Sequence, residues 1–273
     1  MPYPFLSQMT WNVDLSLTLM MLGSAALLVA VYGVRTSKKG KVEFDRVEKQ
    51  GSSSLMNKGM MNMTYWGLQP LGDLCIFLGL SPNSISWIAL IFGALSAVAL
   101  CFGHFGTAGF LAAICSLLDA VDGMVARKTG LASDSGEVVD ASVDRYVEFF
   151  FLAGLIFYYR EIPSLMVICL FALLGSFMVS YSTAKAEALQ VTPPRGNMRR
   201  TERALYLTLG AILAPISIQT IETYGAYPVS LGYPMIFALS MVALFSNISA
   251  VQRLIAIAQA VKQKEDALKK NRQ

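Results

Sequence analysis

Long apolar stretches separated by short polar ones set the predicted architecture of the chain. A membrane-spanning helix needs about 20 mainly apolar residues. Five stretches meet that requirement clearly: Leu15–Val34, Ile85–Phe102, Leu165–Tyr181, Ala204–Ile221 and Pro234–Val251. Two more, near Thr107–Val125 and Val139–Tyr159, have the length but contain acidic residues. The pattern predicts an all-α integral membrane protein with a six-helix core and one extra N-terminal transmembrane helix.

The composition agrees with a chain that is solvated largely by lipid. Of its 273 residues 55% are hydrophobic and only 15% are charged, whereas about a quarter are charged in a typical soluble domain. No Lys or Arg precedes the first apolar stretch, and a basic segment follows it. These flanks favour a retained helix over a cleaved signal peptide. The four cysteines show no CxxC spacing and are expected to be free and buried.

Basic residues predict the orientation, because they concentrate in cytoplasmic loops. They follow alternate apolar stretches, as Arg35–Lys49, Arg127–Lys128, Arg195–Arg203 and Lys262–Arg272. With seven spans all of these segments lie on one face, so we expect the N-terminus outside and the C-terminus in the cytoplasm. The net charge of +4 follows from this topology and gives no indication of nucleic-acid binding.

The chain divides into four parts along its length. We expect an outer tail and the extra helix in 1–35, a charged, Gly/Ser-rich cytoplasmic linker in 36–55, an interfacial segment and six-span core in 56–256, and a polar cytoplasmic tail in 257–273. Ser81-Pro82-Asn83-Ser84 is a helix-start signal ahead of the core. His104 is interpreted as a turn residue in a short outer loop.

Acidic residues interrupt two of the apolar stretches in a regular way. Asp119 and Asp122 are three positions apart, and Asp140 and Asp144 are four apart, so each pair shares one helix face. Between the pairs, Lys128–Gly136 is polar and contains two glycines and two serines, which indicates a turn between antiparallel helices. Four carboxylates are therefore expected to converge at the cytoplasmic end of adjacent helices.

Such a cluster requires a compensating cation. A carboxylate deep in a membrane helix costs about 2.5–3.5 kcal/mol on insertion scales. Carboxylates without His or Cys select oxygen-binding ions such as Mg²⁺, Mn²⁺ or Ca²⁺, and protein-bound Mg²⁺ often also holds substrate phosphates. The small residues Gly123, Ala126 and Gly136 allow close approach, and the guanidinium of Arg127 suits phosphate. Together these features indicate phosphoryl or pyrophosphate chemistry.

The spacing Asp119-x2-Asp122-Gly123-x2-Ala126-Arg127-x8-Gly136-x3-Asp140-x3-Asp144 resembles the signature of the CDP-alcohol phosphotransferases at every defined position. The resemblance implies that Asp119, Asp122 and Asp140 hold divalent metal at the CDP pyrophosphate. It implies that Asp144 shares in metal binding and acts as the base on the acceptor hydroxyl. Gly123, Ala126 and Gly136 would line the cytidine site, with Arg127 beside it.

The resemblance also implies the wider setting. The cofactor would be Mg²⁺ or Mn²⁺, the donor CDP-diacylglycerol, and the products CMP and a phosphodiester lipid. The family core is six spanning helices after an interfacial helix, usually in a homodimer. We expect a protein of the bacterial inner (cell) membrane with its active site facing the cytoplasm.

The acceptor is indicated by a basic loop after the fifth span. Tyr181-x-x-Ala-Lys185-Ala-Glu187 and Arg199-Arg-Thr-Glu-Arg203 resemble the inositol-phosphate-using branch of the family, in which corresponding basic residues bind the phosphate. The candidates here are Lys185, Arg195, Arg199 and Arg203. Topology alone also explains such a loop, and Thr183 stands where that branch often has a basic residue. Phosphatidylglycerophosphate synthesis from glycerol phosphate is the alternative.

Two other classes fit parts of the pattern. Intramembrane prenyltransferases also use aspartate-bound Mg²⁺ and a pyrophosphate, but their acidic motifs normally lie far apart in sequence. An acidic-lined ion transporter would place its carboxylates near the bilayer midplane, whereas these are predicted at helix ends. Metal-dependent release of CMP distinguishes the proposed enzyme from both.

Overall fold

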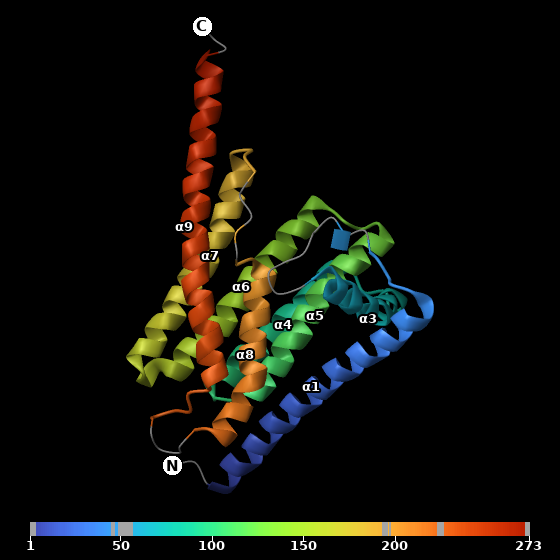
Figure 1. Cartoon of the computed structure of the whole chain (residues 1–273), viewed down its shortest axis with the longest axis vertical. Coiled ribbons are helices and arrows are strands. Elements are labelled where there is room, and N and C mark those ends of the chain that lie inside the picture. Colours follow the sequence, from blue (N-terminus) through green and yellow to red (C-terminus); the bar gives the residue numbers. More distant parts are fainter. Residues whose placement is uncertain are drawn as a thin grey trace.

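The computed structural model describes residues 4–44, 47–48, 57–192, 196, 198–222 and 227–270, which form helices and connecting turns without a strand. The helices are α1 (Pro4–Lys39), α3 (Lys58–Phe77), α4 (Pro82–Cys101), α5 (Phe105–Thr129), α6 (Asp134–Tyr158), the 3-10 turn η1 (Tyr159–Glu161), α7 (Pro163–Ala188), α8 (Arg200–Thr220) and α9 (Tyr233–Lys270). Figure 1 shows α4 to α9 gathered in one bundle, with α1 inclined along its side.

A helix occupies each of the seven stretches that the apolar pattern predicts, and α3 occupies the interfacial segment. Five helices are long and apolar enough to cross a membrane: α1 from Val13 onward, α4, α5, α7 and α9. The other two, α6 and α8, have 25 and 21 residues but begin with charged turns. The all-helical membrane fold is thus confirmed, while spanning by α6 and α8 stays a prediction.

Several helix ends differ from the expected boundaries. The α1 helix continues to Lys39, into the predicted linker, and α9 continues to Lys270, through most of the predicted tail. The predicted turn Lys128–Gly136 is shorter in the structure. Gly130 ends α5 with a φ of 71°, a backbone conformation that glycine adopts without strain. Gly136 lies in the first turn of α6, where its N–H donates to Ser133 Oγ at 3.2 Å.

The start of α4 follows its sequence signal. Ser81 is the N-cap, and its Oγ accepts from the N–H of Ser84 at 3.2 Å. Pro82 follows in the first turn, where its missing N–H costs nothing. The helix therefore begins three residues before the apolar stretch at Ile85.

The core of the bundle lies where α5 to α9 meet. It contains Phe105, Leu152, Leu155, Tyr159, Cys169, Leu239 and Val242 among its most buried residues. Gly154 of α6 lies so close to α4 that a side chain there would come within 2.6 Å of the Ala97 carbonyl oxygen. Directly after the C-terminal end of α6, the Tyr159 hydroxyl donates to the Leu231 carbonyl at 2.6 Å. These contacts make α4 to α9 one tightly packed body.

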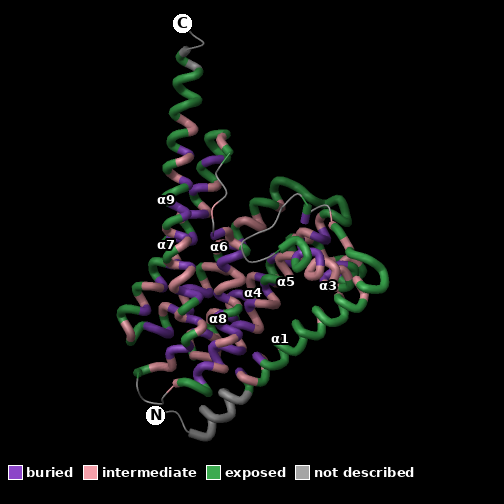
Figure 2. The backbone as a smooth tube through the Cα atoms, viewed as in Figure 1, coloured by how far each residue is buried: buried purple, intermediate pink, exposed green. Residues whose placement is uncertain are grey.

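The added helix α1 contacts this body mainly near its N-terminal end. The buried carboxylate of Asp14 accepts from the N–H and the hydroxyl of Thr107, at 2.8 and 2.7 Å, and lies 3.2 Å from His104 Nδ1. Four residues on, the Thr18 hydroxyl donates to the Ile212 carbonyl at 2.8 Å. Figure 2 shows most of the rest of α1 exposed, in contrast to the buried interior of the bundle. The polar attachment of α1 is therefore concentrated at one end.

Candidate active site

Three of the four predicted aspartates come together between α5 and α6. Asp119, Asp140 and Asp144 each offer one carboxylate oxygen, and these three oxygens lie within 4.8 Å of one another. Asp144 is buried, whereas Asp119 and Asp140 are half-buried. The antiparallel hairpin of α5 and α6 produces the cluster, because each helix carries acids near the connecting turn.

The fourth aspartate, Asp122, has a different setting. Its side chain is buried, and it accepts a hydrogen bond of 2.6 Å from the hydroxyl of Ser86 on α4. It lies outside the group of three converging carboxylates. Its predicted role as a metal ligand stays a prediction.

Arg200, the first residue of α8, faces the cluster. Its guanidinium pairs with Asp119, with 3.2 Å between Nη2 and Oδ1, and also with Asp144. The sequence analysis assigned its neighbours Arg199 and Arg203 to the site but not Arg200. The signal that could have found it is Glu202, the third residue of α8, whose carboxylate accepts from the Arg199 N–H at 2.7 Å and so marks the start of the helix. This contact fixes where α8 begins, and therefore on which side of the helix the Arg200 side chain lies.

A narrow cleft of about 60 Å³ opens beneath the carboxylates. Four helices line it: Gly93 and Ser96 from α4, Cys115 and Asp119 from α5, Asp144 and Phe151 from α6, and Arg200, Leu207 and Thr208 from α8. Its mouth is charged and its interior is largely apolar. A charged group bound at the carboxylates would therefore have an apolar wall directly behind it.

The residues predicted at the cytidine site lie along the same helix pair. Gly123 and Ala126 are half-buried on α5, and Arg127 is exposed at the next position. Gly136 is half-buried in the first turn of α6, and a side chain there would lie 3.8 Å from Asn83 Oδ1. Their contact with a nucleotide stays a prediction.

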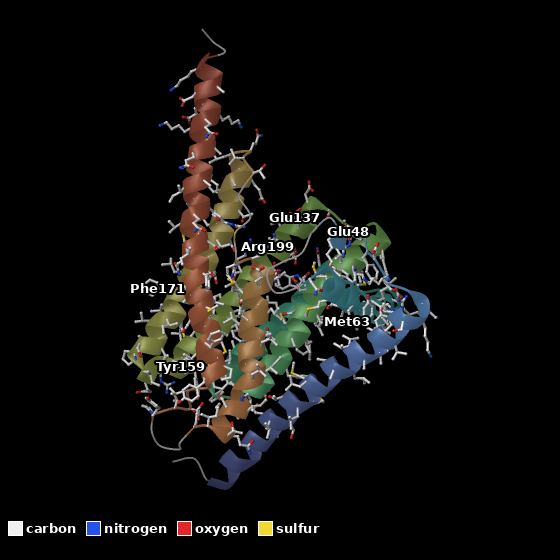
Figure 3. All side chains as sticks on the ribbon, in the orientation of Figure 1. Glu48, Met63, Glu137, Tyr159, Phe171 and Arg199 are labelled. Atoms are coloured by element: carbon white, nitrogen blue, oxygen red, sulfur yellow. The ribbon has the colours of Figure 1, made fainter. Side chains whose placement is uncertain are left out.

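The predicted acceptor residues divide into three groups. Arg203 is completely buried, and its Nε and Nη2 donate to the Glu148 carboxylate at 2.6 and 2.9 Å. Arg199 is half-buried at the start of α8, while Lys185 is exposed in the last turn of α7. Arg195 lies outside the described residues. Figure 3 shows Arg199 toward the same end of the bundle as Glu137 of α6, with Tyr159 at the opposite end.

Arg253 of α9 is a further cation that the sequence analysis did not identify. Its Nη1 donates to Thr183 Oγ1 at 2.9 Å. Its buried Nε finds no hydrogen-bond acceptor among the described residues. Its charge interacts unfavourably with those of Arg199 and Arg203. Arg253 thus reaches Thr183 from a helix far along the chain.

The donor set fits a divalent cation. The cluster offers only carboxylate oxygens, which Mg²⁺ and Mn²⁺ prefer. Three carboxylates in and around a membrane bundle need positive charge, and Arg200 supplies one unit of it. The fold and the cluster together define a helical membrane protein with a carboxylate site suited to a divalent metal.

Comparison with known proteins places this class in a family. The model of the CDP-alcohol phosphatidyltransferase family matches residues 79–261, which is most of the chain and includes every predicted site residue. The chain belongs to this family and is an enzyme of that kind. The resemblance read from the aspartate spacing is thereby confirmed.

Relatives and solved structures agree with this placement. The chain is 28% identical to phosphatidylinositol phosphate synthase of Cutibacterium acnes over 199 residues, covering 71% of this chain and 93% of the relative. It is 35% identical over 149 residues to the bifunctional IPC transferase and DIPP synthase of Archaeoglobus fulgidus, covering 52% of this chain but 30% of that relative. Mycobacterium tuberculosis phosphatidylinositol phosphate synthase, solved with manganese and citrate, shares the fold with a TM-score of 0.60 at 23% identity, covering 69% of this chain and 87% of the other. The same protein was also solved with CDP-DAG bound, and that structure has a TM-score of 0.59.

Proposed function

We propose that this enzyme transfers a phosphatidyl group from CDP-diacylglycerol to a hydroxyl of inositol phosphate and releases CMP. The observation that carries the proposal is the pairing of two sites of opposite charge. The carboxylates of Asp119, Asp140 and Asp144 converge on one volume, and the arginines Arg199, Arg203 and Arg253 gather near it. Metal-bound pyrophosphate suits the first site, and a phosphorylated alcohol suits the second.

The acceptor assignment rests on the arginine side chains near the site, whose positive charge is only partly neutralised by acidic side chains of the protein. Glu148 neutralises Arg203, but Arg253 has only the Thr183 hydroxyl and an unpaired Nε within the described part of the chain. A buried cation without a counter-charge is unfavourable, and guanidinium groups pair well with phosphate. A phosphorylated acceptor would supply that charge, whereas serine or free inositol would not.

The chemistry follows from the placement of Asp144. As the general base it takes the proton of the acceptor hydroxyl while the acceptor oxygen attacks the phosphorus that bears the diacylglycerol. The bond from that phosphorus to the bridging oxygen breaks, and CMP leaves with the electron pair. Asp119, Asp122, Asp140 and Asp144 would hold a divalent cation, which would draw charge from the pyrophosphate and make CMP a better leaving group. Mg²⁺ is the proposed ion, with Mn²⁺ as a substitute.

The wider assignments belong to the same proposal. We take residues 56–256 as the catalytic core, with the other segments as additions. The site faces the cytoplasm of a bacterial inner membrane, which the basic residues beside it support. The enzyme acts as a homodimer, as the family resemblance implies.

The testing experiment measures CMP release by purified protein in detergent with CDP-diacylglycerol and Mg²⁺ or Mn²⁺. Inositol phosphate, glycerol phosphate, free inositol and serine are offered separately. Release with inositol phosphate alone is the expected result. Release only with glycerol phosphate would keep the chemistry and replace the acceptor, while release with free inositol or serine would contradict the anion pocket.

Asp144→Asn provides the control for this assay. The amide cannot accept the proton and is a weaker metal ligand, so the rate should fall at least about 100-fold. Full activity in the folded Asp144→Asn variant would remove Asp144 from the mechanism.

A further inference from the structure

The added helix α1 and the helix α3 enclose a second cleft, separate from the carboxylate site. Its volume is about 570 Å³. The α1 wall consists of Ser24, Leu27, Leu28 and Val31, and the α3 wall of Trp66, Gly67, Gln69, Pro70 and Asp73. Neither wall carries a residue that the proposed reaction uses. The cleft is therefore distinct from the site of the proposed reaction.

The walls of the cleft are held in place by a short crossing of the two helices. Gly67 allows this crossing, because a side chain there would lie 3.1 Å from Leu28 Cδ1. Farther along α1, the rings of Tyr32 and Trp66 lie 5.5 Å apart, and the Arg35 guanidinium lies 5.7 Å from the centre of the Trp66 ring. The contact between α1 and α3 is small, so the cleft beside it stays open.

The position of the cleft along α1 indicates an apolar occupant. Its α1 residues, 24–31, lie within the span Val13–Lys39, so the cleft opens into the hydrocarbon of the bilayer. Leu27 and Val31 are exposed, and contact between such an apolar surface and water is unfavourable. A lipid acyl chain is the occupant that the bilayer supplies at this depth.

The end of the cleft indicates the charge of that lipid. Arg35 lies over Trp66, and Lys38, Lys39 and Lys41 follow it. None of these four cations has an ion pair within the part of the chain that the structure describes. The nearby carboxylate of Asp73 is paired with Lys128 at 2.6 Å. Basic pockets between spanning helices at the cytoplasmic surface suit anionic headgroups, and tryptophan favours the headgroup level.

We propose that this cleft binds one anionic phospholipid. Its acyl chain lies against Leu27, Leu28 and Trp66, and its phosphate lies at Arg35, with the lysines beyond. The lipid fills the space between α1 and the catalytic core, where the two make few direct contacts with each other. This site does not depend on the proposed acceptor or on the transfer reaction.

Quenching of Trp66 by brominated lipid tests the site. The full chain carries Trp11→Phe and Trp87→Phe, so that Trp66 is its only tryptophan. It is placed in bilayers of mixed phosphatidylcholine and phosphatidylglycerol in which one of the two is brominated. Brominated phosphatidylglycerol should quench Trp66 at about a five-fold lower mole fraction than brominated phosphatidylcholine.

Substitutions of Arg35 at the basic end of the cleft test whether the lipid preference depends on this site or on the general positive charge of the protein surface. Arg35→Gln should reduce the preference for the anionic lipid to near that of a neutral one, and Arg35→Lys should retain most of it. Arg160→Gln is the matched control, because Arg160 is exposed at the other end of the bundle. It should leave the preference unchanged.

Two results would overturn the proposal. One is equal quenching by both brominated lipids in the parent chain. The other is a disulfide between two copies of a Leu27→Cys chain in the membrane, which would identify a second copy as the occupant. The CMP-release assay is run on the same samples, so that a failure of the lipid site and a failure of the proposed reaction are distinguished.

Discussion

At the scale of single residues, the convergence of the acidic side chains could be predicted from the sequence, whereas the positions of the arginines Arg200 and Arg253 could not. Asp119, Asp140 and Asp144 converge as their helical spacing indicated, because helix periodicity is local. Arg200 and Arg253 reach the site from helices whose rotation and tilt depend on packing across the bundle. No local pattern carries that information, so their roles became visible only in three dimensions.

Arg200→Gln should increase the affinity of the enzyme for Mn²⁺ by about ten-fold. The guanidinium competes with a metal ion for Asp119 and Asp144, and its removal also removes a repelling charge. About 1.4 kcal/mol, a modest value for a partly buried charge pair, corresponds to that factor. Free Mn²⁺ is measured by electron paramagnetic resonance during titration of the purified protein. Lys128→Gln serves as the control, because Lys128 pairs with Asp73 instead, and unchanged or weaker binding in Arg200→Gln would show that Arg200 does not compete.

Arg253→Gln should raise the KM for inositol phosphate by about 10- to 100-fold, as expected for the loss of a charged hydrogen-bonding partner. The KM for CDP-diacylglycerol should stay the same, and Arg253→Lys should recover part of the loss. Steady-state kinetics with each substrate varied in turn provides the measurement. Lys262→Gln, an exposed position on the same helix, is the control. Equal changes in both KM values would indicate a structural role in place of phosphate binding.

At the scale of elements, α1 is attached to the bundle by one of its side chains, which caps the helix α5. His104 precedes α5 and makes no side-chain cap of its own. Asp14 of α1 accepts from the Thr107 N–H in its place. The sequence analysis interpreted His104 as a turn residue, and it could not pair it with an acid 90 positions earlier. An interhelical cap of this kind has no short-range signature.

Asp14→Asn should lower the stability of the protein by about 0.5–2 kcal/mol, the usual range for loss of a helix cap. The neutral amide retains an oxygen but is a weaker acceptor at a helix N-terminus. Thermal stability is measured by size-exclusion chromatography of detergent-solubilised protein after heating. Asp73→Asn is the matched control, since its ion pair with Lys128 is exposed and should contribute little. Equal losses for the two variants would contradict the special role of Asp14.

The same contact predicts a pH dependence. The hydrogen bond with Asp14 raises the pKa of His104 above its usual 6.5, and partial burial opposes this. A raised folded-state pKa contributes stability that is fully present below pH 6.5 and is lost as the pH rises through the folded value. The stability difference between the parent chain and His104→Asn should therefore be larger at about pH 5.5 than at about pH 8.5. A difference that grows with pH would contradict this charge pairing.

At the scale of the whole molecule, the apolar pattern predicted the helices better than it predicted the contacts between them. A helix forms in each of the seven apolar stretches. Figure 1 shows the start of α1 and the end of α9 at opposite ends of the molecule. The inclination of α1 and its cleft against α3 were not predictable. They depend on a few contacts, such as Leu28 with Gly67, that look like ordinary membrane positions in the sequence.

This arrangement predicts which loops face which side of the membrane. Glu161→Cys, between α6 and α7, should react in intact cells with a maleimide that cannot cross the membrane. Lys264→Cys, on the polar end of α9, should react only after the cells are opened. Both side chains are exposed, and the native cysteines, three of them buried, provide the background. The reverse pattern of labelling would place the active site outside the cell.

Because Asp14 caps α5, removing α1 would also remove a cap from the catalytic core. The family match begins at residue 79, and α1 lies before it. Within the described residues, the hydrogen bonds of α1 to the core come from Asp14 and Thr18. A shortened chain that begins near residue 57 would leave the first turn of α5 without its cap. Placing an aspartate at the N-cap itself, as His104→Asp, would make α5 self-sufficient. That single change defines a minimal enzyme in which the catalytic core can be studied without α1.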